Sequence, residues 1–384
     1  MKELGLYIHI PFCKQKCAYC DFYSLPCYNT YGKRYIDALC KQIEKESEGY
    51  KEHVIDTVFL GGGTPSLLNA DDITRLINTV KKELKLTQDC EITIEANPCT
   101  LTREKLNTYH SLGINRLSIG LQSANDNELS YLGRLHTVED FLSAYELARL
   151  CGFENISVDL MYGIPRQSVD SLKNTLDTVC ALNPEHVSAY CLKIEENTPF
   201  GRKKDTLPLP NEDEEYEMYS LICDVLNKNG YEQYEISNFA KKGKRCQHNL
   251  KYWLSKEYIG FGPGAHSFFD GRRYCYKSDI FEYVCAIECG DMPHKIYEND
   301  SESKHVSSQN DKTDEYLMLK MRLVDGISEN EFSKRFKKSL LSTYPELLKY
   351  VKTGHIINEN GRYYFTRDGF FVSNYILSDI LKLD

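Results

Sequence analysis

Strand-like and helix-like segments alternate through the first part of the chain, up to about residue 230. Six short runs rich in β-branched and aromatic residues each precede a longer amphipathic segment with helical periodicity. Repeated strand–helix units predict a parallel sheet with right-handed crossovers. Since a closed barrel of this kind needs about eight units, the pattern predicts an α/β fold with an open, partial (β/α)6 barrel. The predicted strands are residues 5–10, 56–60, 91–96, 116–121, 156–161 and 186–192, and the predicted helices are residues 31–48, 70–84, 102–112, 138–151, 168–181 and 211–229.

The rest of the chain divides into three segments after the predicted barrel, residues 1–230. Residues 231–298 contain closely spaced glycines and the single tryptophan, Trp253, and we expect short strands that cover the barrel mouth or its open side. Residues 299–314 are almost entirely polar and predict an exposed linker. Residues 315–384 predict a small C-terminal helical domain, with three helices before a β-turn-β pair, an order that resembles a winged helix.

Composition restricts the functional classes. The net charge of −9 argues against general nucleic-acid binding, and the winged-helix-like segment has no basic recognition stripe. No apolar run reaches the length of about 18 residues that a membrane span needs. The first residues enter a predicted strand without the apolar stretch of a signal peptide. The 15 cysteines lack the spacing of a disulfide framework, so we expect free thiols in a reducing cytoplasm.

Three cysteines follow the first predicted strand within a short loop. Cys13, Cys17 and Cys20 are separated by three and then two residues. An odd number of thiols so close together cannot all pair as disulfides, and a structural zinc site would need a fourth ligand that does not follow at the usual spacing. Three thiolates fit a [4Fe–4S] cluster whose fourth iron stays open to another ligand.

Further polar residues lie where predicted strands end, which is where function gathers in parallel α/β barrels. Residues 61–65 read GGGTP, which predicts either a tight turn or a backbone that passes close to a ligand. Glu95 and Asp159 interrupt apolar runs and each demands a partner. For Glu95 the alternative to a ligand is an inward ion pair, and for Asp159 one candidate partner is Arg134. Gln122 ends the fourth strand, and Arg134 is either an anion-binding residue or a solvated surface arginine.

At this point the motifs resemble a known group of proteins. Cys-x3-Cys-x2-Cys is the pattern of the radical S-adenosylmethionine (SAM) superfamily, and YIHIPFC, GGGTPS, EANP, GLQS, LGRLH, DLMYGIP and HNLKYW are similar to its oxygen-independent coproporphyrinogen III oxidase family. The resemblance implies a radical SAM barrel in which the three cysteines hold the cluster and SAM occupies the open iron. For Tyr7 and Tyr19, which are among the implied SAM contacts, packing in the core is the alternative to binding SAM. The implied SAM contacts are Tyr7, Tyr19, Gly62, Gly63, Thr64, Glu95, Gln122, Arg134 and Asp159.

Two residues after the third cysteine distinguish branches of this family. The oxidases continue with Gly-Cys, whereas this chain has Asp21 and Phe22. The resemblance is therefore to the HemW-type haem chaperone branch, which implies a cytoplasmic protein that binds haem and hands it to an acceptor protein, membrane-associated acceptors included. An electron donor is a further implied partner. The alternatives are the oxidase or another radical SAM enzyme of porphyrin metabolism, and a redox- or SAM-sensing regulator.

The predicted haem ligand lies in the HNLKYW segment. His248 follows a basic stretch, and a neutral imidazole is a common axial ligand of haem iron. His266 and Cys246 are competing candidates. The candidates for pairing with haem propionates are Arg245, Lys251, Arg272 and Arg273.

Overall fold

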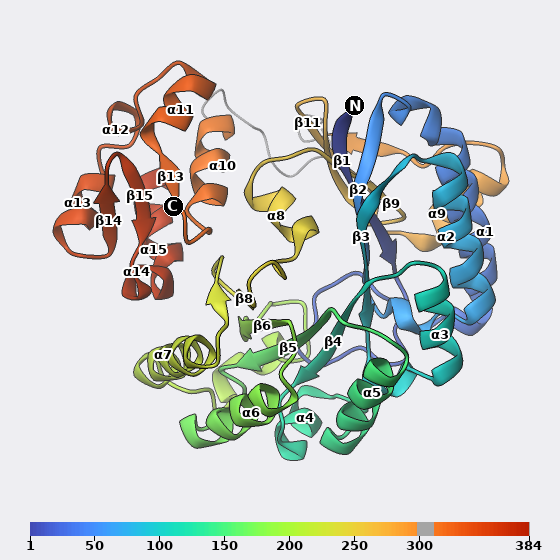
Figure 1. Ribbon diagram of the computed structural model, residues 1–384, viewed down its shortest axis with the longest axis horizontal. Coiled ribbons are helices and arrows are strands. Elements are labelled where there is room, and N and C mark those ends of the chain that lie inside the picture. Colours follow the sequence, from blue (N-terminus) through green and yellow to red (C-terminus); the bar gives the residue numbers. More distant parts are fainter. Residues whose placement is uncertain (298–310, 384) are drawn as a thin grey trace.

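The computed structural model describes residues 1–297 and 311–383 (Figure 1). It confirms the six predicted strands as neighbours in one sheet, all parallel and in chain order, and it shows no closed barrel. The strands are β1 (Lys2–Ile10), β2 (His53–Gly62), β3 (Leu86–Ala96), β4 (Arg116–Gln122), β5 (Ile156–Tyr162) and β6 (His186–Cys191). The helices of this part are α1 (Tyr28–Glu46), α2 (Ala70–Glu83), α3 (Arg103–Ser111), α4 (Asp126–Leu132), α5 (Val138–Leu150), α6 (Val169–Leu182) and α7 (Glu212–Lys228).

Alternate residues of each strand face opposite sides of the sheet. In β1, Leu4, Leu6 and Ile8 are fully buried in the core that α1 and α2 cover, whereas Tyr7 and His9 face the barrel interior. The same alternation in the other strands lines the interior with polar groups. Side-chain caps define the start of several crossover helices: the Asn69 side chain accepts from a backbone N–H of α2, and Thr137 forms a capping box with α5.

The segment after α7 extends the sheet at both edges. The described strands of this large sheet have the order β12-β11-β10-β9-β1-β2-β3-β4-β5-β6-β8-β7. β9 (Tyr258–Phe261) pairs in parallel with β1, so the described sheet has a seventh parallel strand that the sequence pattern did not reveal. The segment therefore lies at two edges, with β8 beside β6 and β9 beside β1. The remaining added strands are β7 (Glu232–Gln233), β8 (Asn238–Ala240), β10 (His266–Phe269), β11 (Arg272–Tyr276) and β12 (Lys295–Tyr297).

Two helices accompany these strands. α8 (Gln247–Trp253) lies against the N-terminal half of β2, where Lys251 forms an ion pair with Asp56, and α9 (Ile280–Glu288) packs on α1. The predicted linker, residues 299–314, lies outside the described residues except for its last four, which belong to α10 (Asp311–Lys320). No helix in the described ranges combines the length and apolar character that crossing a membrane requires.

The C-terminal domain has the predicted winged-helix-like order. Its three-stranded sheet runs β13-β15-β14, and the domain touches the barrel where Tyr216 of α7 donates to Asp368 at 2.6 Å and where Arg273 of β11 pairs with Glu315 of α10 (Figure 1). Its elements after α10 are β13 (Ile327–Ser328), α11 (Glu329–Phe336), α12 (Leu340–Thr343), α13 (Leu347–Lys352), β14 (Ile356–Glu359), β15 (Arg362–Phe365), α14 (Arg367–Phe371) and α15 (Ser373–Leu381).

Candidate functional site

The three clustered cysteines lie in a loop that follows the carboxyl end of β1. Phe12 anchors the start of this loop: its ring is fully buried and packs edge-on against Tyr35. The backbone N–H of Cys13 donates to the backbone oxygen of Leu25 and closes the loop on itself, and that of Ala18 donates to Leu132 of α4 at 3.0 Å and ties the loop to the barrel. The three thiols remain half-buried and unpaired.

Three half-buried thiols of one loop have the chemistry that a [4Fe–4S] cluster requires, because such a cluster takes each cysteine at a different iron. The Cys13 thiol lies 3.5 Å from the Thr64 hydroxyl, and Arg134 points a guanidinium nitrogen at the Cys17 thiol from 3.7 Å. A hydroxyl and a cation therefore lie next to two of the three thiols.

The glycine run after β2 packs against this loop. A Cβ atom at Gly63 would lie 2.6 Å from the backbone oxygen of Phe12, and one at Gly62 would lie 2.5 Å from the His9 ring. Gly62 also has a φ of +111°, which side chains disfavour. The close approach predicted for these glycines is therefore observed, and its partner in this structure is the chain itself. The glycines set the height of the cysteine loop above the sheet.

Glu95 faces the barrel interior just below the glycine run. Its carboxyl accepts a hydrogen bond from the backbone N–H of Gly62 at 3.2 Å, and it has no ion-pair partner among the described residues. The predicted alternative of an inward ion pair is therefore wrong. Burial, with a smaller contribution from the negative charge of Asp159, raises the pKa of Glu95 to about 8. The carboxyl is thus mostly protonated at neutral pH and can donate as well as accept.

Asp159 does not pair with Arg134, contrary to one sequence-based expectation. Its carboxylate accepts from the Ser118 hydroxyl at 3.0 and 3.1 Å and from the Ser157 hydroxyl at 3.3 Å. Burial raises its pKa despite these hydrogen bonds. Ser118 comes from the neighbouring strand β4, whereas Ser157 lies two residues before Asp159 in β5 and therefore on the same face of the sheet.

Arg134 instead turns toward the cysteine loop, so it is not a solvated surface arginine. Besides its contact with Cys17, it donates to the backbone oxygen of Gly120 at 3.0 Å, and its buried Nε has no hydrogen-bond partner among the described residues. Gln122 has a φ of +71°, and a Cβ at Gly120 would lie 2.7 Å from its amide nitrogen. The strand end is therefore strained so that Gln122 and Arg134 share one side of the mouth.

The two tyrosines occupy different environments. Tyr7 lies in the middle of β1, where its ring packs near Phe59 and His248 and its hydroxyl donates to His9 at 3.0 Å. Burial, and then the charge of Glu95, raises its pKa. Tyr19 is half-buried at the mouth and joins a small apolar cluster. Tyr7 thus packs in the barrel interior, and Tyr19 lies within the cysteine loop itself.

His9 is a site residue that the sequence interpretation missed. Its ring accepts from the Tyr7 hydroxyl and donates from Nε2 to the backbone oxygen of Tyr23 at 2.9 Å. Burial lowers its pKa to about 4, so the imidazole is neutral at pH 7. It connects the barrel interior to the far end of the cysteine loop. The available signal was its spacing of two from Tyr7, which places both side chains on one face of a strand.

The predicted haem ligand His248 is buried at the opposite end of the barrel. Its Nδ1 lies 2.9 Å from the Thr57 hydroxyl and its Nε2 lies 2.8 Å from the Tyr252 hydroxyl, so both ring nitrogens are bonded. Burial lowers its pKa to about 3. The competing candidate Cys246 is also fully buried, with its thiol directed at Glu91.

The candidate propionate partners are scattered. Lys251 is buried in its ion pair with Asp56 at 2.7 Å and cannot meet a propionate without breaking that pair. Arg245 pairs with Glu232 at the surface, and Arg273 pairs with Glu315. The structure therefore does not bring these four cations together as one site.

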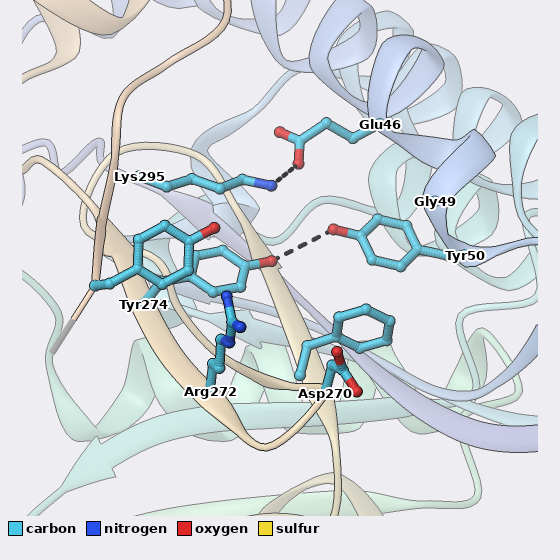
Figure 2. A pocket seen from close by; sticks show the side chains of 9 residues that line it. Glu46, Gly49, Tyr50, Asp270, Arg272, Tyr274 and Lys295 are labelled. Carbon is cyan, nitrogen blue, oxygen red and sulfur yellow. Dashed lines mark hydrogen bonds and ion pairs between the residues drawn. The ribbon is translucent and has the colours of Figure 1, made fainter. Parts of the chain in front are cut away.

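Arg272 lines a separate cavity of about 400 Å³ on the outer edge of the sheet. Figure 2 shows Lys295 of β12 paired with Glu46 and the hydroxyls of Tyr50 and Tyr274 facing each other across it. The cavity lies between the end of α1, the short 3-10 helix η1 (Ser47–Tyr50) and β10–β12. It contains none of the residues predicted to bind the cluster or SAM.

Comparisons with known proteins agree with this geometry. Residues 7–179 match the radical SAM superfamily and residues 308–372 match the HemN C-terminal domain. The haem chaperone HemW of Bacillus subtilis (strain 168) is 35% identical, and the match covers 98% of each chain. The chain belongs to the HemW family of radical SAM proteins. The HemW of Escherichia coli (strain K12) is 41% identical over 78% of this chain and 82% of that protein.

A solved structure extends the likeness beyond the HemW relatives. The coproporphyrinogen III oxidase HemN of Escherichia coli, titled a radical SAM enzyme, matches with a TM-score of 0.84 over 98% of this chain and 89% of its own, at 22% identity. At that identity the likeness shows a common fold. The partial barrel and the C-terminal domain are therefore shared between HemW-family and HemN proteins.

Proposed function

We propose that this protein is a haem chaperone that carries a [4Fe–4S] cluster and SAM, binds haem and transfers it to an acceptor protein. The observation that carries the proposal is the nearly full-length match to relatives named haem chaperone HemW. The match includes both the barrel and the C-terminal domain, so it concerns the whole described architecture.

The residues at the barrel mouth fit the two resident cofactors. Cys13, Cys17 and Cys20 supply three thiols at separate positions, and the adjacent orphaned Nε of Arg134 needs an acceptor that the described chain does not supply. When bound, the cluster and SAM supply one-electron chemistry that amino-acid side chains cannot provide. The residues that would hold SAM are Tyr7, Tyr19, Gly62, Gly63, Thr64, Glu95, Gln122, Arg134 and Asp159.

The polar side chains at this mouth differ in charge and therefore in the ligand groups that they can bind. Arg134 supplies a permanent cation beside the thiols and above the Gly120 backbone oxygen. Glu95 supplies a carboxyl that is mostly protonated at pH 7 and that becomes an anion when a cation approaches, because a nearby positive charge lowers its pKa. Asp159 supplies an acceptor whose position is held by two serine hydroxyls. Together they suit a ligand with both an ammonium and a carboxylate end.

The proposed function implies a cellular compartment and a set of partners. None of the 15 cysteines forms a disulfide, which suits a reducing cytoplasm. The proposed partners are haem, an acceptor haemoprotein, which can itself be membrane-associated, and an electron donor for the cluster. Phe22, which stands where the oxidases have cysteine, is 70% exposed and supplies no additional thiol to the loop.

Anaerobic reconstitution followed by haem titration and transfer tests the proposal. We expect near-stoichiometric haem binding, seen as a Soret band, and delivery of that haem to an apo-haemoprotein in the presence of SAM. Absence of any Soret change would refute the chaperone. Formation of protoporphyrinogen from coproporphyrinogen, with SAM and a reductant, would instead identify the oxidase. A gel shift with DNA that persists at physiological salt would identify a regulator.

A further inference from the structure

An open cavity of about 400 Å³ lies beside the cysteine loop and contains none of the residues proposed to bind the cluster or SAM. Ala18, which directly follows Cys17, forms part of its wall. Phe200 lies next to Ala18 in this wall, because its backbone N–H donates to the Ala18 oxygen at 2.9 Å. Tyr131 of α4 forms another part and is exposed. The cavity therefore reaches the chain within one residue of a proposed cluster ligand.

Lys203 and Arg166 place two positive charges at this cavity. Lys203 lines it from the 3-10 helix η4 (Gly201–Thr206). The Arg166 guanidinium lies 5.2 Å from the centre of the Tyr131 ring, which is a cation–π distance. Arg166 has a φ of +66°, and its backbone N–H donates to the oxygen of Pro208 at 2.8 Å. The chain thus holds this guanidinium over an exposed aromatic wall, although a side chain disfavours the left-handed backbone conformation.

The cysteine loop and η4 contribute further cations. Lys14 and Lys16 are exposed on either side of Gln15, whose amide donates to the backbone oxygen of Gly133 at 3.4 Å. Gly133 ends α4 two residues after Tyr131, so this part of the loop lies next to the cavity wall. The exposed cations of this region form a basic face, which comprises Lys14, Lys16, Arg166, Arg202, Lys203 and Lys204.

The basic face differs from the rest of the chain in charge. The whole chain has a net charge of −9, yet the segments of the face contain only two acids, Asp21 and Asp205. No ion-pair partner of its six cations is found in the described ranges, whereas Arg34 and Lys173 at other surfaces pair with acids. The face therefore presents a positive field that the protein itself does not neutralise. Its segments are residues 13–22, 131–135, 164–167 and 199–209.

Position and charge together indicate the kind of partner that fits this face. The face adjoins the loop that is proposed to carry a one-electron centre, so a protein bound here lies close to that centre. Complexes that pass electrons are typically small and transient, and charge complementarity increases their rate of association more than their affinity. A basic face with an aromatic cavity wall therefore suits a negatively charged redox protein.

We propose that the basic face is the docking site of a small acidic redox protein that passes one electron to the cluster. The inference rests on the proposed function, because it requires the cluster in the cysteine loop. In the transfer the docked protein loses one electron and the cluster gains it, and no covalent bond forms or breaks. The cations of the face attract the donor and orient it, and the exposed Tyr131 wall supplies apolar contact area.

The test is stopped-flow reduction of the reconstituted full-length protein by reduced flavodoxin, an acidic flavoprotein that serves as the probe. Visible absorbance gives the rate, and electron paramagnetic resonance identifies the reduced cluster. The second-order rate constant should fall at least about tenfold as salt rises from about 50 mM to about 500 mM, because salt screens the attraction between charges. A rate constant that does not change with salt would overturn the proposal.

Two double variants locate the effect on the surface. R166E combined with K203E should slow reduction by flavodoxin about tenfold at low salt and remove most of the salt dependence. The matched control combines K85E with K242E, which reverses two exposed charges near the amino ends of β3 and β6, at the other end of the barrel. The control should stay close to the wild type. Photoreduced 5-deazariboflavin, a small reductant that needs no docking face, should reduce all three proteins at the same rate.

The other outcomes overturn the assignment. Equal slowing in both double variants would show an effect of net charge, and slower reduction of the R166E/K203E variant by deazariboflavin would show damage at the cluster. Unchanged reduction by flavodoxin with slower haem delivery to an acidic apo-haemoprotein would assign the face to the haem acceptor. Failure of the wild type to bind haem, with reduction by flavodoxin intact, would refute the proposed function and leave the docking face standing.

Discussion

Replacing Glu95 with glutamine should stabilise the cofactor-free protein, although the residue is a proposed SAM contact. The folded chain holds this carboxyl away from water, facing Asp159, with one hydrogen bond from Gly62. An amide of the same shape keeps the hydrogen-bond acceptor and removes the ionisable group. The stability of the substituted barrel should therefore no longer depend on the ionisation of this position.

The magnitude follows from the pKa. In the folded chain the pKa of Glu95 is about 8, against 4.5 for a free glutamate side chain. Between these values the folded state binds one proton more than the unfolded state, so the free energy of unfolding falls as pH rises. At about 1.36 kcal/mol per pH unit, the loss reaches about 3 kcal/mol at pH 7 and at most about 5 kcal/mol above pH 8. Glu95→Gln should remove this loss, and its advantage should vanish near pH 4.5.

Urea unfolding of the cofactor-free chain from pH 5 to 8.5 measures the effect, with fluorescence of Trp253 in α8 as the signal. The variant should unfold at higher urea than the wild type at pH 8 and at similar urea at pH 5. A matched control is Glu91→Gln in the same strand: Glu91 accepts from the backbone N–H groups of Gln247 and His248. Losing this charged helix cap should cost about 1 to 2 kcal/mol at all these pH values. Parallel pH profiles for wild type and Glu95→Gln would refute the reasoning.

Three further predictions concern the loop and the floor of the barrel. Cys13→Ala should abolish cluster reconstitution while Cys285→Ala, at an exposed cysteine of α9, should not, as iron and sulfide content will show. Gly63→Ala should lower the yield of cluster and cost about 1 to 3 kcal/mol, because its Cβ would lie 2.6 Å from a backbone oxygen of the cysteine loop; an unchanged urea midpoint would contradict this. Lys251→Met should cost about 3 to 5 kcal/mol by leaving Asp56 without its partner, and adding Asp56→Leu should restore much of the loss, whereas additive losses in the double variant would refute the pairing.

Local periodicity predicted most of the elements. The strand–helix alternation placed all six parallel strands and their order, because each strand must bury one apolar face and each following helix must cover it. It missed β9, since a four-residue strand that contains Gly260 and is followed by Gly262 carries almost no periodic signal. It also could not place the segment around α8, whose position depends on contacts with β2 and β3 far away in the sequence.

Spacing within the chain and proximity in space determined different parts of the site. The cysteine pattern and the strand-end residues were readable in the sequence, because a cluster loop needs its ligands close together along the chain and parallel strands end at one edge. The hydrogen-bond partners of these residues could not be predicted from the sequence. Asp159 accepts from serine hydroxyls and Arg134 contacts the cysteine loop, and both outcomes depend on the tertiary arrangement of the strands and loops. The sequence therefore determined the family and the proposed cofactors. Only the tertiary structure decided which partners the buried polar side chains have, because burial and hydrogen bonding of a side chain are set by segments distant in sequence.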